Sequence, residues 1–143
     1  MTPAPSADAP VVLADWPAGT PALLTTVGAD GPHAIPVSTA LRAGPGTVLL
    51  ALGARRGSLA RLRENPRCAL AIVAADLAVT LRGRATVVGD AAGTVAVRLD
   101  VDALDDHGQP TFAIDEGVRW HWTDPDAERR DAEVRAALSR FAR

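Results

Sequence analysis

Residues 51–73 read Ala51-Leu-Gly-Ala-Arg-Arg-Gly-Ser-Leu-Ala-Arg-Leu-Arg-Glu-Asn-Pro66-Arg-Cys-Ala-Leu-Ala-Ile-Val73 and place a short basic helix between two apolar strands. Helix N-termini carry partial positive charge, and Arg55, Arg56 and Arg61 add forked donors that can bind phosphate oxygens in pairs. The stretch therefore predicts a site for an anionic group. The same arginines also fit a solvated helix face, so this alternative stays open.

Short apolar runs separated by turn residues continue on both sides of this stretch and predict a mainly β fold. In the strands around residues 77–88 and 94–102, apolar and polar side chains alternate, which is typical of a barrel wall with one face in the core. Glycine-containing turns at residues 30–32, 43–46 and 89–93 predict hairpins, so consecutive strands should pair antiparallel. The six predicted strands are Ala22 to Val27, His33 to Leu41, Thr47 to Leu52, Arg67 to Ala74, Leu77 to Val88 and Thr94 to Asp102.

Two helices complete the predicted fold. The first runs from Ser58 to Asn65, between the third and fourth predicted strands, with Ser58 as its N-cap and Pro66 forcing its end. The second lies at the C-terminus, where Asp124 can cap and Pro125 suits the first turn. Its apolar stripe of Val134, Leu138 and Phe141 should pack on the barrel or on a second subunit.

The composition places the chain among globular proteins with one domain. Its 143 residues are 48% hydrophobic, so we expect a single domain over residues 11–143 and a proline-rich, mobile tail over residues 1–10. The net charge of −2 argues against a general nucleic-acid binder. All 15 basic side chains are arginines, which excludes a lysine Schiff base or a lysine general base from the mechanism. The single cysteine, Cys68, excludes an intrachain disulfide and is expected to be a core residue.

The sequence also bears on the compartment. The first ten residues contain no positive charge and no apolar run, and the most apolar stretch, residues 68–81, is too short to cross a bilayer. We therefore expect a cytoplasmic protein without membrane contact.

Three segments, in this order, resemble one known family. Leu23-Leu-Thr-Thr-Val-Gly-Ala-Asp-Gly-Pro-His-Ala-Ile-Pro-Val37 is similar to the opening hairpin of the pyridoxamine 5′-phosphate oxidase-like split-barrel proteins. Leu62-Arg-Glu-Asn-Pro-Arg-Cys-Ala-Leu70 resembles the Leu-Arg-x-(Asn/Asp)-Pro-Arg-Val-Ala-Leu run of that family, and Leu81-Arg-Gly-Arg-Ala85 resembles a later strand. The resemblance covers residues 20 to 90 and implies a six-stranded antiparallel split β-barrel.

The resemblance also implies a homodimer with two sites at the subunit interface, each holding flavin mononucleotide (FMN) or the deazaflavin coenzyme F-420. The cofactor phosphate would lie where Arg56 and Ser58 stand. Arg56 matches a basic position of the family, whereas Ser58 replaces a common lysine, which leaves Arg55, Arg56 and Arg61 to compensate. The substrate-binding Arg-x-His of the oxidase itself is missing, so we do not expect pyridoxamine phosphate oxidation.

A flavin ring is flat and largely apolar, so it needs a strand surface of small residues. Candidates for this floor are Pro36, Val37, Ser38, Ala51, Leu52, Gly53 and Gly83. Gly83 has the alternative of a β-bulge without a ligand. Trp120 and Trp122 would share one face of a strand, with His121 opposite, and could serve the core, a dimer contact or ring stacking.

The acidic run of Asp100, Asp102, Asp105, Asp106 and His107 lacks the pattern of a calcium loop, so we expect a solvated turn there and no metal site.

These observations favour a flavin- or deazaflavin-dependent oxidoreductase that acts on a small molecule. No dedicated catalytic residue is predicted, because the hydride chemistry would belong to the cofactor. Two alternatives remain: a carrier or sensor that holds the cofactor or haem without turnover, and a split barrel that has lost its ligand site.

Overall fold

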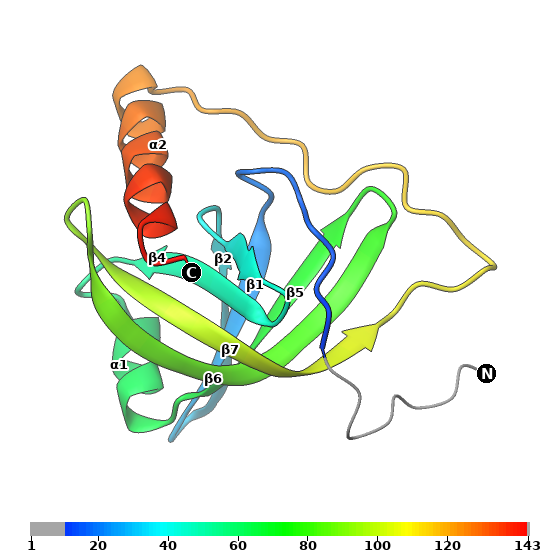
Figure 1. The fold of residues 1–143 in the computed structure, drawn as a ribbon, viewed down its shortest axis with the longest axis horizontal. Helices are drawn as coiled ribbons and strands as arrows, with labels where there is room; N and C mark the ends of the chain where they lie inside the picture. Colours follow the sequence, from blue (N-terminus) through cyan, green and yellow to red (C-terminus); the bar gives the residue numbers. More distant parts are fainter. Residues whose placement is uncertain (1–10, 143) are drawn as a thin grey trace.

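The computed structural model describes residues 11–142, and the predicted tail over residues 1–10 lies outside them. One antiparallel sheet has the strand order β2-β1-β5-β6-β7-β4-β3 (Figure 1). The elements are β1 (Ala22–Gly28), β2 (Gly31–Val37), β3 (Leu41–Gly44), β4 (Thr47–Leu52), α1 (Gly57–Glu64), β5 (Arg67–Ala74), β6 (Leu77–Ala91), β7 (Thr94–Asp106) and α2 (Pro125–Ser139). The mainly β, antiparallel architecture predicted from the sequence is confirmed.

The strand count differs by one from the prediction, because the predicted strand His33 to Leu41 is two strands. Residues 38–40 leave the sheet and bond elsewhere: the Thr39 hydroxyl accepts from the Ala51 N–H at 3.0 Å, and the Ala40 carbonyl accepts from the Trp16 indole at 2.9 Å. The first bond ties the end of β2 to β4, and the second ties it to the segment that precedes β1. The short helix consequently follows the fourth strand.

The barrel interior is filled by alternating strand residues and closed by α1. Leu24, Leu70 and Leu81 belong to the main core cluster and are at most 1% exposed. Leu59 and Leu62 of α1 join the same cluster. Burial of these side chains, at about 1.5–3 kcal/mol each, is the main force that closes the sheet.

Helix α1 begins one residue earlier than predicted, and its predicted cap is wrong. Arg56 occupies the N-cap position without a capping hydrogen bond from its side chain, while Ser58 lies inside the first turn and is only 1% exposed. The predicted stop is confirmed: Asn65, before Pro66, has extended backbone angles of φ −137° and ψ 105°.

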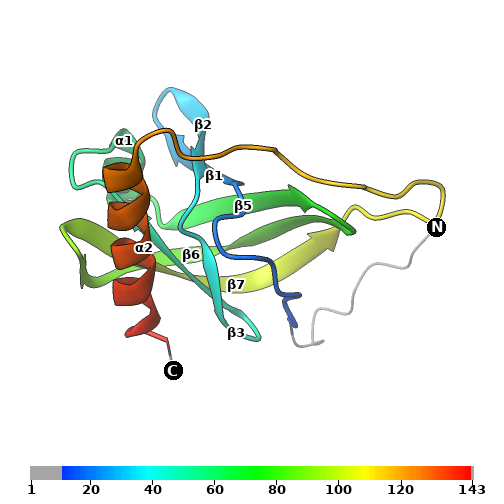
Figure 2. The same ribbon diagram turned by 90° about the horizontal axis from the view of Figure 1, so that it is seen from above.

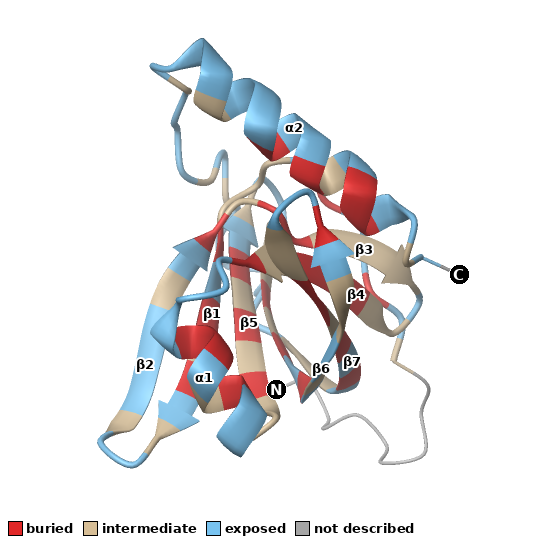
Figure 3. Ribbon diagram, turned by 90° about the vertical axis from the view of Figure 1, so that its left-hand side faces the viewer, coloured by how far each residue is buried: buried red, intermediate tan, exposed pale blue. Residues whose placement is uncertain are grey.

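Helix α2 has the predicted cap and packs on the sheet. The Asp124 carboxylate accepts from the Asp126 N–H at 2.9 Å, and Pro125 occupies the first turn. Val134 and Leu138 pack with Leu49 of β4 in a second apolar cluster. Figure 3 shows the buried residues of α2 on the side that faces the sheet.

A long segment over residues 107–124 joins β7 to α2 without a helix or strand. Figures 1 and 2 show it running from the β5–β6 end of the molecule to the end that carries α2. The Asp76 N–H donates to the Ile114 carbonyl at 3.0 Å, which fastens the segment to the β5–β6 turn. The predicted strand around Trp120 and Trp122 is therefore wrong, because no neighbouring strand pairs with it.

The acidic run is a strand rather than the predicted turn. β7 continues to Asp106, and its outward carboxylates meet arginines: Arg82 Nε lies 3.0 Å from Asp105 Oδ2, and Arg67 bonds Asp102. The hydrogen bond from Arg67 holds the pKa of the Asp102 carboxyl below its ordinary value. Within residues 11–142, no group of three potential ligands is arranged to hold a metal, and no helix is long and apolar enough to span a membrane.

Candidate functional site

The arginines predicted to bind an anion gather at the N-terminus of α1. Arg55 and Arg56 are exposed in the loop between β4 and the helix. The first N–H groups of a helix have no partner within it, and here no side chain caps them and the first turn contains no acidic residue. Positive side chains at the positive end of a helix repel one another unless an anion is bound. The arrangement therefore suits a phosphate group.

Arg61 is already oriented toward this end of the helix. Its Nε donates to the hydroxyl of Thr26, which is fully buried on β1, at a distance of 3.0 Å. Two glycines make room for the side chain: a Cβ on Gly28 would lie 2.9 Å from Arg61 Cδ, and one on Gly57 would lie 3.3 Å from Nη1. The Arg61 guanidinium thus lies beside the first helical residue. Because the side chain is already held there, binding an anion would cost little further side-chain entropy.

The residues predicted as a ring floor divide between the core and the surface. Pro36 and Gly53 are exposed and Ser38 is half-buried, whereas Val37 and Leu52 point into the barrel core. Ala51 packs against the α2 cluster, so this helix covers part of the predicted floor. Helix α2 consequently forms a wall beside Ala51, near the end of β4.

Gly83 is explained by packing between strands. It lies at an irregularity in the β6–β7 pairing, and a Cβ there would be only 2.0 Å from the Asp100 carbonyl oxygen. The close approach of the β7 backbone therefore requires glycine here, as the β-bulge alternative foresees.

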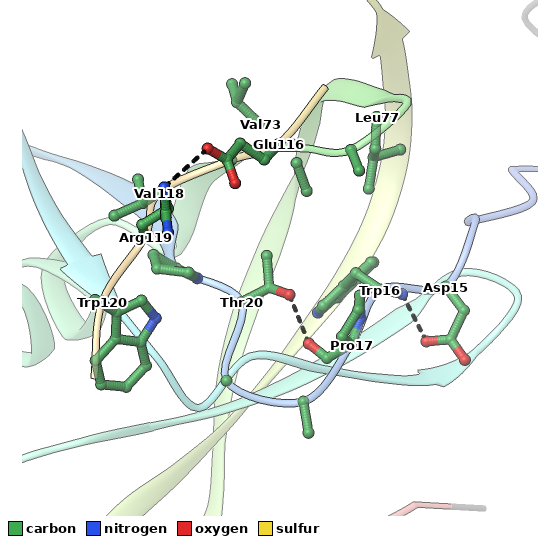
Figure 4. A pocket seen from close by; sticks show the side chains of 16 residues that line it. Asp15, Trp16, Pro17, Thr20, Val73, Leu77, Glu116, Val118, Arg119 and Trp120 are labelled. Carbon is green, nitrogen blue, oxygen red and sulfur yellow. Dashed lines mark hydrogen bonds and ion pairs between the residues drawn. The ribbon is translucent and has the colours of Figure 1, made fainter. Parts of the chain in front are cut away.

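Trp120 belongs to a different region from the arginines. It lines a cavity of about 540 Å³ between the arm of residues 15–21, the β5–β6 turn and the 116–120 segment. Figure 4 shows Trp120 at one end of this cavity and Trp16 and Asp15 toward the other. The rings of Trp120 and Trp122 are edge to face, with centroids 5.1 Å apart. Within this single chain, then, the predicted site residues form two groups.

Two residues that bond to predicted site residues, Asp131 and Thr26, were not predicted from the sequence. Asp131 on α2 accepts a hydrogen bond from the Ser38 hydroxyl at 3.1 Å. A sequence signal existed for it, because Asp131 stands three residues before Val134 and seven before Leu138, on the apolar stripe of the helix. Thr26 gave no such signal, since a threonine on an inward strand position is an ordinary core residue.

A family model described as pyridoxamine 5′-phosphate oxidase matches residues 12–110. The chain belongs to this family. The match includes the whole sheet and α1, and it ends before α2, so the wall that this helix forms lies outside the matched part.

Solved structures share the fold at low sequence identity. A candidate pyridoxamine 5′-phosphate oxidase from Lactobacillus delbrueckii is 19% identical with a TM-score of 0.55, over 60% of this chain and 84% of that one. A protein named F420 reductase is 16% identical with a TM-score of 0.55, over 61% and 90%. A FAD-binding protein from Mesorhizobium loti is 12% identical with a TM-score of 0.51, over 59% and 81%. No curated protein matches the chain.

Proposed function

We propose that this family member is an oxidoreductase that uses FMN or a deazaflavin coenzyme to act on a small molecule. The observation that carries the proposal is the group of Arg55, Arg56 and Arg61 at the uncapped N-terminus of α1. The names of two structural relatives, an F420 reductase and a FAD-binding protein, agree with such a cofactor. When bound, the cofactor would supply the hydride chemistry.

The roles of the chain's own residues follow from their positions. The three arginines and the free N–H groups of the first helical turn would bind the phosphate. Pro36, Ser38 and Gly53 would lie under the ring, beside the wall made by α2. Trp120 and Trp122 lie elsewhere in the protomer, so they would reach a ring only from a partner subunit.

An apolar face on β2, β1 and β5 supports a homodimer. Leu23 is 49% exposed and pairs with Pro36 on one side and Ala71 on the other. Val27 and Val73 are likewise exposed on the outer side of their strands. Contiguous apolar surface of this kind marks an interaction face more often than free surface. The molar mass in solution, from sedimentation, tests this part directly.

Cofactor titration of the Arg56→Ala variant tests the phosphate site. Affinity for FMN or coenzyme F-420 should fall about ten-fold or more, because a charge-assisted phosphate bond contributes roughly 1.5 to 3 kcal/mol. Arg63→Ala is the matched control, since Arg63 is exposed in the last turn of the same helix and should change affinity little. Equal affinities of the wild type and the Arg56→Ala variant would refute the site.

The absorbance of the purified protein and a reduction assay separate the function classes. Reduction of the bound cofactor by a nicotinamide donor supports the oxidoreductase. Binding without reduction by any donor would instead identify a carrier or sensor, and a Soret band would identify a haem protein.

A further inference from the structure

Asp131 is the one charged residue that is buried within residues 11–142. It is 9% exposed and lies on the face of α2 that packs against the sheet. A carboxylate in such a place costs stability unless partners compensate for the lost water. The contacts of the Asp131 carboxylate therefore show how its charge is compensated.

Two side chains hold the Asp131 carboxylate. Ser38 Oγ donates to Oδ1 at 3.1 Å, and Arg135 Nε lies 3.3 Å from Oδ2. Oδ2 receives no hydrogen bond within the described part of the chain, so the Arg135 contact is an ion pair without hydrogen-bond alignment. Gly19 leaves room for Arg135, because a Cβ at Gly19 would lie 3.3 Å from Nη1. The arginine offsets the buried charge, and Ser38 alone makes a directed bond.

The bond to Asp131 determines what Ser38 can offer a ligand. A serine hydroxyl has one hydrogen to donate and two lone pairs to accept with. Because the hydrogen is directed to Asp131, the oxygen can only accept from a ligand on the outer side. Ser38 is half-buried, and the neighbouring Thr39 is bonded to Ala51, so the acceptor is also fixed relative to β4.

The ring of an oxidised flavin or deazaflavin carries an imide N–H between two carbonyl groups. Ser38 lies at the end of β2 that Thr39 ties to β4, and β4 leads directly to the arginines proposed for the phosphate. A cofactor held there by its phosphate would extend its ring toward Ser38. We propose that Asp131 holds the Ser38 hydroxyl as the acceptor for the imide N–H of the ring. This inference rests on the proposed function, and Asp131 is a positioning residue in it.

Comparison of FMN with FMN methylated at the imide nitrogen tests the inference, because methylation replaces the donated hydrogen with a methyl group, and the variants below separate the lost hydrogen bond from the added bulk. The wild type should bind FMN about five-fold more tightly than the methylated compound, which corresponds to a typical single hydrogen bond. Ser38→Ala and Asp131→Ala should reduce this preference toward unity. Asp131→Asn retains an acceptor oxygen for Ser38 and should preserve it. Glu133→Ala, which removes an exposed acid of the same helix, is the control and should leave it unchanged.

The preference is a ratio measured on one folded protein, so a loss of stability in a variant does not change it. A wild type that binds FMN at the arginines but shows no preference, or a Ser38→Ala variant that keeps it, would overturn this inference alone. A wild type that binds neither FMN nor coenzyme F-420 would overturn both the proposed function and this inference.

Discussion

Raising the pH from 8 to 11 should destabilise the fold through Cys68. Burial raises the pKa of this thiol from its ordinary value of 9.0 to about 11, against a smaller opposite effect of the charge on Arg67. Cys68 lies on β5, is 8% exposed and faces the main core cluster. The thiolate form would therefore lose most of its hydration on folding, and burial favours the neutral thiol.

The sign and size follow from proton linkage. Below pH 9 the thiol is protonated in both states, and its contribution to stability is constant. Between pH 9 and pH 11 the unfolded chain loses the proton first, so the free energy of unfolding falls. With 1.36 kcal/mol for each pK unit, the loss is about 1.4 kcal/mol at pH 10 and about 2 kcal/mol at pH 11.

The composition isolates this effect. The chain contains no tyrosine and no lysine, and arginine titrates above this range, so Cys68 is the one side chain expected to titrate between pH 9 and pH 11. Urea unfolding, followed by tryptophan fluorescence at pH 8, 9, 10 and 11, measures the slope. The Cys68→Ala variant should lose a constant amount of stability at every pH and show no alkaline slope. An equal slope in both proteins would refute the reasoning.

Two further changes test the fold. Gly83→Ala should lower the free energy of unfolding by at least about 2 kcal/mol, because the new Cβ would overlap the Asp100 carbonyl; Gly44→Ala, whose Cβ would come no closer than 3.8 Å to a neighbour, is its control in urea unfolding. Asp124→Ala removes the N-cap of α2 and should cost about 1 kcal/mol, whereas Asp124→Asn keeps an acceptor and should be nearly neutral; a thermal melt in which both variants behave alike would contradict the cap.

Local chemistry made several elements predictable. β4 and β5 have the predicted bounds, because alternation and flanking turns act within a few residues. Gly31 and Gly93, in predicted turns, have φ values of 108° and 85°, which glycine adopts at little cost. Pro66 ends α1 as expected, and Asp124 caps α2. The residues of the candidate phosphate site also follow one another closely in the chain, so their juxtaposition needed no long-range information.

The sequence by itself determined the antiparallel β class, the position of the basic helix and the clustering of Arg55 and Arg56, since each depends on neighbours along the chain. Tertiary structure decided which surfaces meet. Only the pairing of β7 with β6 turns the acidic run into a strand and makes Gly83 obligatory. Only the packing of α2 on β4 brings Asp131 to Ser38, 93 residues away, because contacts between distant segments depend on how the whole core is buried.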